Sequence, residues 1–400
     1  MMTCERHIDF PKGWRILVVG GDHHNTLASL RSLGRDGVPF DLLLHSGMKS
    51  ADGLMVPSSK YCPKNFELVD NNVEAISEGY RSWLTDKDPR LCIVLASSDL
   101  SAYVADRELA PKGIVTYSFS GEPGRVAGLM DKYEQYVWAQ AHGVPMARSV
   151  IVTSRDHAAA GLSFPLILKP LVSAFGEKTD IAIVDSPDSY AAAVARLFAD
   201  GYERLLVQEV VDFDYEVVAS GCIFLSDGKE SHITLRKELT YPRKAGNVAI
   251  GRSEAAPEME KLFEKVIGEL SSEGFRGMFD IEVFATRDGA VLNEINFRQS
   301  GNMFACLDSG MSLPLLWALD AAGEEIRPPE PFGGRLRIVA EPQLVSGVTH
   351  RQIGVGAAIA AMAGADSFAL RAKDDKAPSR RFFLGGFAAK LSKALCKKGR

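Results

Sequence analysis

Two alternating runs near residue 290 restrict the fold of this chain more than any other feature of its sequence. The runs span residues 278–285 and 290–298, and they flank the tripeptide Arg287-Asp288-Gly289. Polar and apolar residues alternate with a period of two in both runs, which is the pattern of β-strands with one buried face. The tripeptide predicts a three-residue hairpin loop with Gly289 in the left-handed conformation.

The predicted hairpin has one polar face and one apolar face. Its loop length places Glu282 opposite Glu294 and Asp280 opposite Asn296, while phenylalanine and isoleucine pairs occupy the other face. A slip of one residue would mix the two faces, so this register is favoured. Opposed side chains have Cβ atoms about 5 Å apart, and facing carboxylates repel unless a positive charge lies between them.

A magnesium ion fits this polar face. Mg²⁺ takes oxygen ligands and is usually held by one or two carboxylates, with substrate phosphates completing its shell. Glu282, Glu294 and the side-chain carbonyl of Asn296 supply such oxygens. Arg298 on the same face adds a planar donor for phosphate or carboxylate groups. From the hairpin alone, a solvated polar face is an equal alternative, because alternating charged strands are common.

Length and composition describe an ordinary globular chain. Its 400 residues are 46% hydrophobic and 24% charged, which predicts two or three lobes. The formal net charge of -5 gives no basic field, so nucleic acid is not expected as a partner. The six cysteines form no CxxC pair, and no run of eighteen apolar residues occurs. We therefore expect a cytoplasmic protein with reduced thiols.

The N-terminal part opens with a βαβ pattern over residues 15–44. Its turn, Gly20-Gly21-Asp22, lacks the glycine spacing of a dinucleotide-binding loop, which disfavours NAD. Ser98 and Asp99 follow the apolar strand predicted at residues 91–95, at the edge where open α/β sheets bind ligands. A helix cap is the simpler explanation for these two residues.

Further helices and strands alternate along the rest of the chain. The expected helices are 124–141, 189–198, 257–272 and 350–362, and the expected strands are 149–152, 164–169, 181–184, 205–210, 233–238 and 335–345. The segment 377–400 carries seven lysines and arginines and no acidic residue. A docked helix with a solvated basic face is favoured over peripheral contact with an anionic membrane, because Gly385-Gly386 interrupts the helical pattern.

Five segments resemble, in their order and spacing, the ATP-grasp superfamily. They are Asp131-Lys132 on a helix ending at Gly143, the run FPLILKP at 164–170, VQEVV at 207–211, Glu282, and Glu294-x-Asn296-x-Arg298. Within that superfamily the chain looks most like the carboxylate-amine ligases, the group that includes D-aspartate ligase. The resemblance covers about residues 15–325.

The resemblance implies a mixed α/β and α+β fold. It predicts a Rossmann-like preATP-grasp lobe over residues 1–123, an ATP-grasp domain over 124–328 and a C-terminal subdomain with a basic tail over 329–400. The ATP-grasp domain would divide into a small lobe at about 146–206 and a large lobe at about 207–328.

The resemblance also implies roles for individual residues. The set assigned to ATP comprises Lys132, Lys169, Ser173, Gly176, Lys178, Gln208, Glu209, Val211 and Glu216. The set assigned to Mg²⁺, with Mn²⁺ as a substitute, comprises Glu282, Glu294 and Asn296. Arg298 and Lys237 would act at the transferred phosphoryl group, with Lys237 preferred over Arg236. For Lys132 and Glu216, a solvated surface position is the alternative.

Such a protein would be an ATP-dependent ligase. A carboxylate would attack the γ-phosphate of ATP to give an acylphosphate and ADP, and an amine would then displace phosphate to form an amide or peptide-like bond. The expected substrates are a small carboxylic acid and an amine of amino-acid or peptide type, and homodimers are frequent among relatives. Two other classes stay open: a carboxylase-type enzyme similar to biotin carboxylase or to purine-biosynthesis enzymes, and a nucleotide-binding regulator without turnover.

Overall fold

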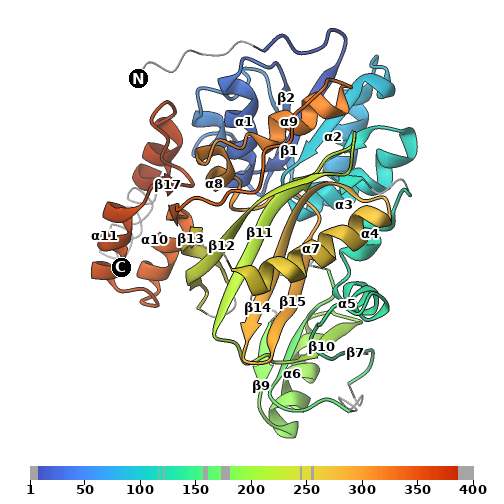
Figure 1. Ribbon diagram of the computed structural model, residues 1–400, viewed down its shortest axis with the longest axis vertical. Helices are drawn as coiled ribbons and strands as arrows, with labels where there is room; N and C mark the ends of the chain where they lie inside the picture. Colours follow the sequence, from blue (N-terminus) through green and yellow to red (C-terminus); the bar gives the residue numbers. More distant parts are fainter. Residues whose placement is uncertain are drawn as a thin grey trace, which may run out of the picture.

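The structure is a computed structural model, shown as a ribbon in Figure 1. It describes residues 8–116, 118–119, 122–155, 161–172, 181–243, 246–253 and 256–385. These residues form three sheets, with the large sheet lying between the other two in Figure 1. The predicted α/β and α+β architecture is confirmed.

The N-terminal sheet has five parallel strands in the order β3-β2-β1-β4-β5. Its strands are β1 (Arg15–Gly21), β2 (Asp41–Ser46), β3 (Glu67–Asp70), β4 (Cys92–Ala96) and β5 (Val115–Thr116). Its helices are α1 (His24–Arg35), α2 (Val73–Leu84) and α3 (Asp99–Glu108), with 3-10 turns η1 (Val56–Ser58), η2 (Pro89–Leu91) and η3 (Ala110–Lys112). Every residue of β4 is buried, as expected for a sheet covered on both faces. The strand order reverses between β1 and β4, so their carboxyl ends border a crevice of the kind that binds ligands.

A small antiparallel sheet follows, in the order β7-β10-β8-β9. Its strands are β7 (Ser149–Val152), β8 (Leu166–Pro170), β9 (Ala182–Val184) and β10 (Leu205–Glu209). Helix α6 (Pro187–Ala199) covers one face, where Val194 and Leu197 pack against Leu168 and Val207. Ser186 begins α6 with a capping box, because its side chain accepts from the Ser189 N–H and Ser189 returns a bond.

The large sheet has eight strands in the order β15-β14-β11-β12-β13-β16-β17, with β6 paired to β14. Its strands are β6 (Ser118–Phe119), β11 (Tyr215–Ile223), β12 (Glu230–Tyr241), β13 (Asn247–Ser253), β14 (Arg276–Thr286), β15 (Gly289–Asn296), β16 (Arg337–Val339) and β17 (Ser367–Phe368). Helix α7 (Pro257–Ser272) packs on β11, β14 and β15, and it contributes Phe263 and Val266 to their core. Further helices are α8 (Met303–Asp308), α9 (Leu313–Ala321), α10 (Glu341–Thr349) and α11 (Val355–Gly364).

The helix predicted over residues 124–141 is wrong in one respect, because it is two helices. These are α4 (Arg125–Leu129) and α5 (Lys132–Ala141). Asp131 leaves the helical conformation, with ψ 120°, and its side chain accepts from the N–H groups of Tyr133 and Glu134. Asp131 is therefore the N-cap of α5, which places Lys132 in the first turn.

The strand predicted over residues 335–345 is also wrong. Only Arg337–Val339 is a strand, and α10 begins at Glu341, where Pro342 in the first turn favours a helix start. The following helix begins at Val355 rather than at residue 350, after Arg351 adopts a left-handed φ of 58°. Strands β16 and β17 lie beyond the predicted boundary at residue 328 and belong to the large sheet. The predicted domain boundaries stay predictions.

None of the helices within the described ranges is both long enough and apolar enough to cross a membrane.

Candidate active site

The hairpin of β14 and β15 has the predicted register at its polar end. Glu282 pairs with Glu294, Asp280 with Asn296 and Ile281 with Ile295. Ile281 and Ile295 are buried, so the apolar face joins the core as predicted.

The turn of this hairpin differs from the prediction of a three-residue loop. Thr286 pairs with Gly289, so the loop contains only Arg287 and Asp288. The Thr286 hydroxyl closes this loop by donating to the Gly289 carbonyl at 2.8 Å and accepting from the Asp288 N–H at 3.2 Å. A bulge at Asn293 then inserts one residue into β15 and restores the predicted register at Glu294.

The two opposed glutamates are each held by a lysine. Glu282 Oε2 lies 3.0 Å from Lys237 Nζ, and Glu294 forms an ion pair with Lys132. The ammonium groups thus provide the positive charge that two facing carboxylates require. Lys132 begins α5 and Lys237 lies on β12, so the two cations come from distant parts of the chain.

Lys237, and not Arg236, faces the site. Lys237 is buried and its Nζ also lies 2.5 Å from Glu216 Oε1 on the neighbouring strand. Arg236 instead places its guanidinium carbon 4.0 Å from the ring centroid of Tyr215. The preference for Lys237 is therefore consistent with the geometry, while its role in catalysis stays a prediction.

Burial and charge give the Glu216–Lys237–Glu282 triad unequal proton affinities. Burial raises the pKa of Glu216 to about 8, against the effect of Lys237. Burial also opposes ionisation of Glu282, but Lys237 and a hydrogen bond from Glu216 outweigh it and lower the pKa of Glu282 to about 2. The nearby carboxylates keep the pKa of Lys237 above its usual value despite its burial. Glu282 is thus ionised at neutral pH, as a metal ligand must be.

Lys169 is the third lysine of the site and is buried at the end of β8. Its Nζ donates to Gln208 Oε1 at 3.0 Å, and Gln208 Nε2 in turn donates to Ser149 Oγ at 3.0 Å. Burial lowers the pKa of Lys169 to about 8, and the charge of nearby Lys132 adds to this effect. Lys132 and Lys169 lie near Glu294, and their charges keep the pKa of Glu294 below its ordinary value despite its burial.

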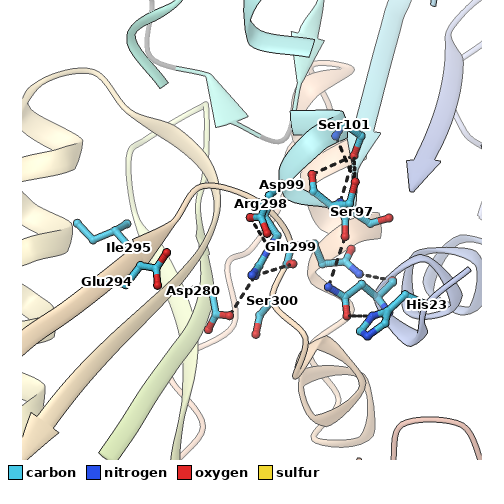
Figure 2. Close-up of polar contacts among 12 residues, drawn as sticks. His23, Ser97, Asp99, Ser101, Asp280, Glu294, Ile295, Arg298, Gln299 and Ser300 are labelled. Carbon is cyan, nitrogen blue, oxygen red and sulfur yellow. Dashed lines mark hydrogen bonds and ion pairs between the residues drawn. The ribbon is translucent and has the colours of Figure 1, made fainter. Parts of the chain in front are cut away.

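Arg298 lies between two aspartates (Figure 2). Its Nε is 3.0 Å from Asp99 Oδ1, and its Nη1 is 3.1 Å from Asp280 Oδ2. Burial disfavours its charge, but the two carboxylates raise the pKa of Arg298 above its usual value. Arg298 therefore connects the large sheet to the carboxyl end of β4.

Of the two residues predicted as a helix cap, Ser98 has that role, while Asp99 is the first residue of the helix and has another contact. Ser98 caps α3 by a capping box with Ser101, as expected. Asp99 additionally reaches Arg298, a contact that the sequence did not indicate. The only available signal was its position after an apolar strand, where open sheets bind ligands.

Gln135 on α5 is a positioning residue that the sequence analysis missed. Its Nε2 donates to the carbonyls of Leu129 and Ile295 at 2.8 Å each, and its Oε1 accepts the Ile295 N–H at 2.9 Å. This side chain fixes the helix of Lys132 against the strand of Glu294. A buried amide one turn after Lys132 was the signal that could have indicated it.

The strand β10, whose last residues are predicted to contact ATP, ends at Glu209. The Glu209 N–H donates to the Arg148 carbonyl at 3.0 Å, and its carboxylate accepts the Ser163 N–H at 2.8 Å. Val211 follows, half-buried. The predicted phosphate-loop residues Ser173, Gly176 and Lys178 lie outside the described residues.

The donor set fits a magnesium–nucleotide complex better than a free metal ion. Within the described ranges, no three His, Cys, Asp or Glu side chains are placed to bind a metal together. Two opposed carboxylates and the Asn296 amide leave most of an octahedral shell to phosphate and water oxygens. Such a site would need a phosphate-bearing ligand, and the side chains of Lys132, Lys169 and Lys237 lie near these carboxylates.

Comparisons with known proteins identify the fold. No protein-family model matches the chain. The N5-carboxyaminoimidazole synthetase from Staphylococcus aureus, complexed with ADP, superposes with a TM-score of 0.64 over 87% of this chain and 88% of its own, at 11% identity. The L-amino acid ligase from Bacillus licheniformis superposes with a TM-score of 0.58 over 80% and 78%, at 14% identity. The chain has the ATP-grasp fold.

Sequence similarity to curated relatives is partial. The formate-dependent phosphoribosylglycinamide formyltransferase of Nitratiruptor sp. is 27% identical over 148 residues, which are 36% of each chain. This chain thus matches little more than a third of that relative's length. These identities show a shared fold and leave the reaction and its substrates to be inferred from the site.

Proposed function

We propose that this protein is an ATP-dependent ligase that joins a carboxylic acid to an amine through an acylphosphate. The observation that supports this most directly is the meeting of three lysines with two opposed glutamates at one site. The lysines come from α5, β8 and β12, and the glutamates from β14 and β15. Phosphoryl transfer requires several negative oxygens to be positioned and neutralised together, and this combination of charges can do both.

The ion pairs indicate how the site would receive a nucleotide. Lys132 and Lys237 neutralise Glu294 and Glu282 in the structure. When phosphate oxygens bind Lys132 and Lys237 instead, the two glutamates lose these ion pairs and can bind a cation together with Asn296. A bound Mg²⁺ would supply charge neutralisation at the phosphates, with Mn²⁺ as a substitute. Buried Lys169 would contact phosphate without having to leave a carboxylate.

The proposed reaction has two steps. A carboxylate oxygen of the acid forms a bond to the γ-phosphorus as the bond to the β,γ-bridging oxygen breaks, and ADP leaves. The amine nitrogen then attacks the acyl carbon, and the carbon–oxygen bond to phosphate breaks. Lys237 would stabilise the transferred phosphoryl group and Arg298 the acylphosphate oxygens, while the remaining residues fix the geometry.

A substrate panel tests this proposal. The purified protein would be supplied with ATP, Mg²⁺ and each of the twenty amino acids and a set of small carboxylic acids, with hydroxylamine as the nucleophile. We expect ADP release and hydroxamate formation with at least one acid, and mass spectrometry with amines in place of hydroxylamine would then identify the product. Absence of ADP release with every acid, or release of AMP, would contradict the proposal.

The second candidate is an enzyme of the purine-biosynthesis type. The similarity to a formate-dependent phosphoribosylglycinamide formyltransferase and to an N5-carboxyaminoimidazole synthetase favours it. Its acid would be formate or bicarbonate and its amine a phosphoribosyl compound. The same panel separates the two candidates if it includes formate and bicarbonate with phosphoribosylglycinamide. The L-amino acid ligase neighbour supports the first candidate.

The predicted homodimer and the predicted cytoplasmic location belong to the same proposal. Gel filtration with light scattering would measure the first, and cell fractionation would measure the second.

A further inference from the structure

Cationic side chains are scarce at the carboxyl ends of β1, β2 and β4, so an anion bound there would depend on the N-termini of α1 and α3. The residues that end these strands, 20–23, 45–46 and 97–99, include no lysine or arginine. His45 Nε2 forms a hydrogen bond with Ser98 Oγ at 2.9 Å. Burial lowers the pKa of His45 to about 4, so this side chain is neutral at pH 7. The nearby Lys49 points to the exposed Asp70 at 2.6 Å. A phosphate group would therefore find little positive charge at these strand ends.

The glycine turn after β1 has a packing role. A Cβ on Gly20 would lie 2.1 Å from Ser97 Oγ and 2.3 Å from Thr26 Oγ1. Only glycine permits this approach of β1 to β4 and α1. The Asp22 carboxylate accepts the N–H groups of Met55 and Val56, at 2.8 and 2.7 Å. The turn is thus explained without an anion.

Carboxylates outnumber cations where the crevice meets the proposed acylphosphate site, and burial raises the pKa of one of these carboxylates, Asp280. Arg298 is shared by Asp99 and Asp280, so one guanidinium faces two carboxylates. Asp280 is 5% exposed, and its Oδ1 has no hydrogen-bond partner within the described ranges. Figure 2 shows Asp280, Arg298 and Asp99 in a row that leads from β14 to the start of α3.

Asp99 is the accessible member of this row. Arg298 engages its Oδ1, and no interaction with its Oδ2 is found among the described residues. Its side chain is 32% exposed and, together with Glu294 and Asn296, lines a pocket of about 10 Å³, which is room for a group the size of one water or ammonium. A group bound at Asp99 Oδ2 therefore lies beside the residues proposed to hold the metal and the acylphosphate.

We infer that the amine substrate enters as an ammonium cation held by Asp99, and that it carries no phosphate group. The inference rests on the proposed ligase function and specifies its second substrate class. The ammonium first loses one proton, because its nitrogen has no lone pair until then, and the amine loses a second proton as the carbon–nitrogen bond forms and the carbon–oxygen bond to phosphate breaks. One passes to the Asp99 carboxylate and the other to the leaving phosphate.

The test compares charged and uncharged nucleophiles in the variant Asp99→Asn. Hydroxylamine is uncharged at neutral pH and reports acid activation, whereas the twenty amino acids and O-phospho-L-serine report amine binding. We expect the best natural acceptor to lack a phosphate, with L-serine used at least as well as its phosphorylated form. In D99N the KM for that acceptor should rise about tenfold to a hundredfold, since a charge-assisted hydrogen bond is lost. The KM for hydroxylamine should change far less.

A matched control is Asp86→Asn, an exposed aspartate of the same lobe whose left-handed φ of 63° suits asparagine. We expect D86N to behave as the wild type. A phosphorylated amine as the best acceptor, or an unchanged acceptor KM in D99N, would overturn the inference alone. So would an enzyme that forms hydroxamate but accepts no amine cation. An enzyme that activates no acid would overturn the ligase proposal as well.

Discussion

At the residue scale, the polar face of the hairpin could be predicted and its ion pairs could not. The alternation of residues places Glu282 and Glu294 opposite each other, and the structure has that pairing. Lys132 lies 162 residues from Glu294, and no local pattern relates the two. The lysines could therefore be named only through a resemblance, and their ion pairs with the glutamates are visible only in the folded structure.

Replacing Glu294 by glutamine tests the proposed metal site. Glutamine keeps the size of the side chain and can still accept from Lys132, so we expect Glu294→Gln to fold like the wild type. It removes one anionic metal ligand, and ATP turnover should fall about 100-fold or more. ADP release and a thermal melt measure the two effects. Asp288→Asn, in the exposed hairpin loop, is the control, and normal turnover in E294Q would refute the assignment.

The pH dependence of ATP use should report the charge of Lys169. Its pKa of about 8 lies below that of an exposed lysine, so its cation is present below pH 8 and is lost as the pH rises through 8. We expect kcat/KM for ATP to decline above pH 8 and Lys169→Ala to raise the ATP KM at neutral pH. Lys169→Arg should flatten the decline, because arginine stays charged. Identical pH profiles for the wild type and K169R would contradict this role.

At the scale of elements, local signals predicted some boundaries and missed others. The strand at 149–152 and the helix at 257–272 have the predicted ends, because periodicity and a proline in the first helical turn are local properties. The hairpin loop was wrong by one residue, since the bulge at Asn293 depends on packing of both strands. The short strand Arg337–Val339 exists because it pairs with β13 and β17, which a sequence window does not contain.

Gln135 should control how α5 meets β15. Gln135→Leu leaves the N–H and carbonyl of Ile295 without this partner, and we expect a loss of about 2–4 kcal/mol in the free energy of unfolding. Turnover should fall as well, because Lys132 and Glu294 lose their fixed spacing. Urea denaturation and ADP release measure both. Gln140→Leu, on the exposed face of the same helix, is the control, and equal stabilities of the two variants would contradict this role.

At the scale of the whole molecule, buried polar contacts join the C-terminal segment to the N-terminal lobe. Arg31 on α1 and Asp375 are both buried and lie 3.0 Å apart, and Arg31 also donates to the carbonyls of Ala369 and Leu370. Ser59 Oγ donates to Asp375 at 2.8 Å. Residues more than 300 positions apart in sequence thus share one polar cluster. Only the folded chain shows this, because each residue alone resembles an ordinary surface charge.

Replacing one member of the Arg31–Asp375 pair should lower the free energy of unfolding more than replacing both members. Asp375→Leu leaves the Arg31 charge buried and unpaired, and we expect a loss of about 3–5 kcal/mol in the free energy of unfolding. The double variant Arg31→Met/Asp375→Leu should lose less than the sum of the single variants. Urea denaturation measures the cycle, with the exposed pair Lys49–Asp70 as a control expected to contribute under about 1 kcal/mol. Strict additivity would contradict the coupling.

We propose that the protein activates a carboxylate as an acylphosphate, and the transfer of an oxygen atom from the acid to phosphate tests this step. An acid that supports ADP release would be labelled with ¹⁸O in its carboxylate and used with ATP, Mg²⁺ and an amine. The account predicts one ¹⁸O atom in each phosphate released, detected by mass spectrometry, and ADP as the nucleotide product. Unlabelled phosphate, or AMP and pyrophosphate, would contradict it.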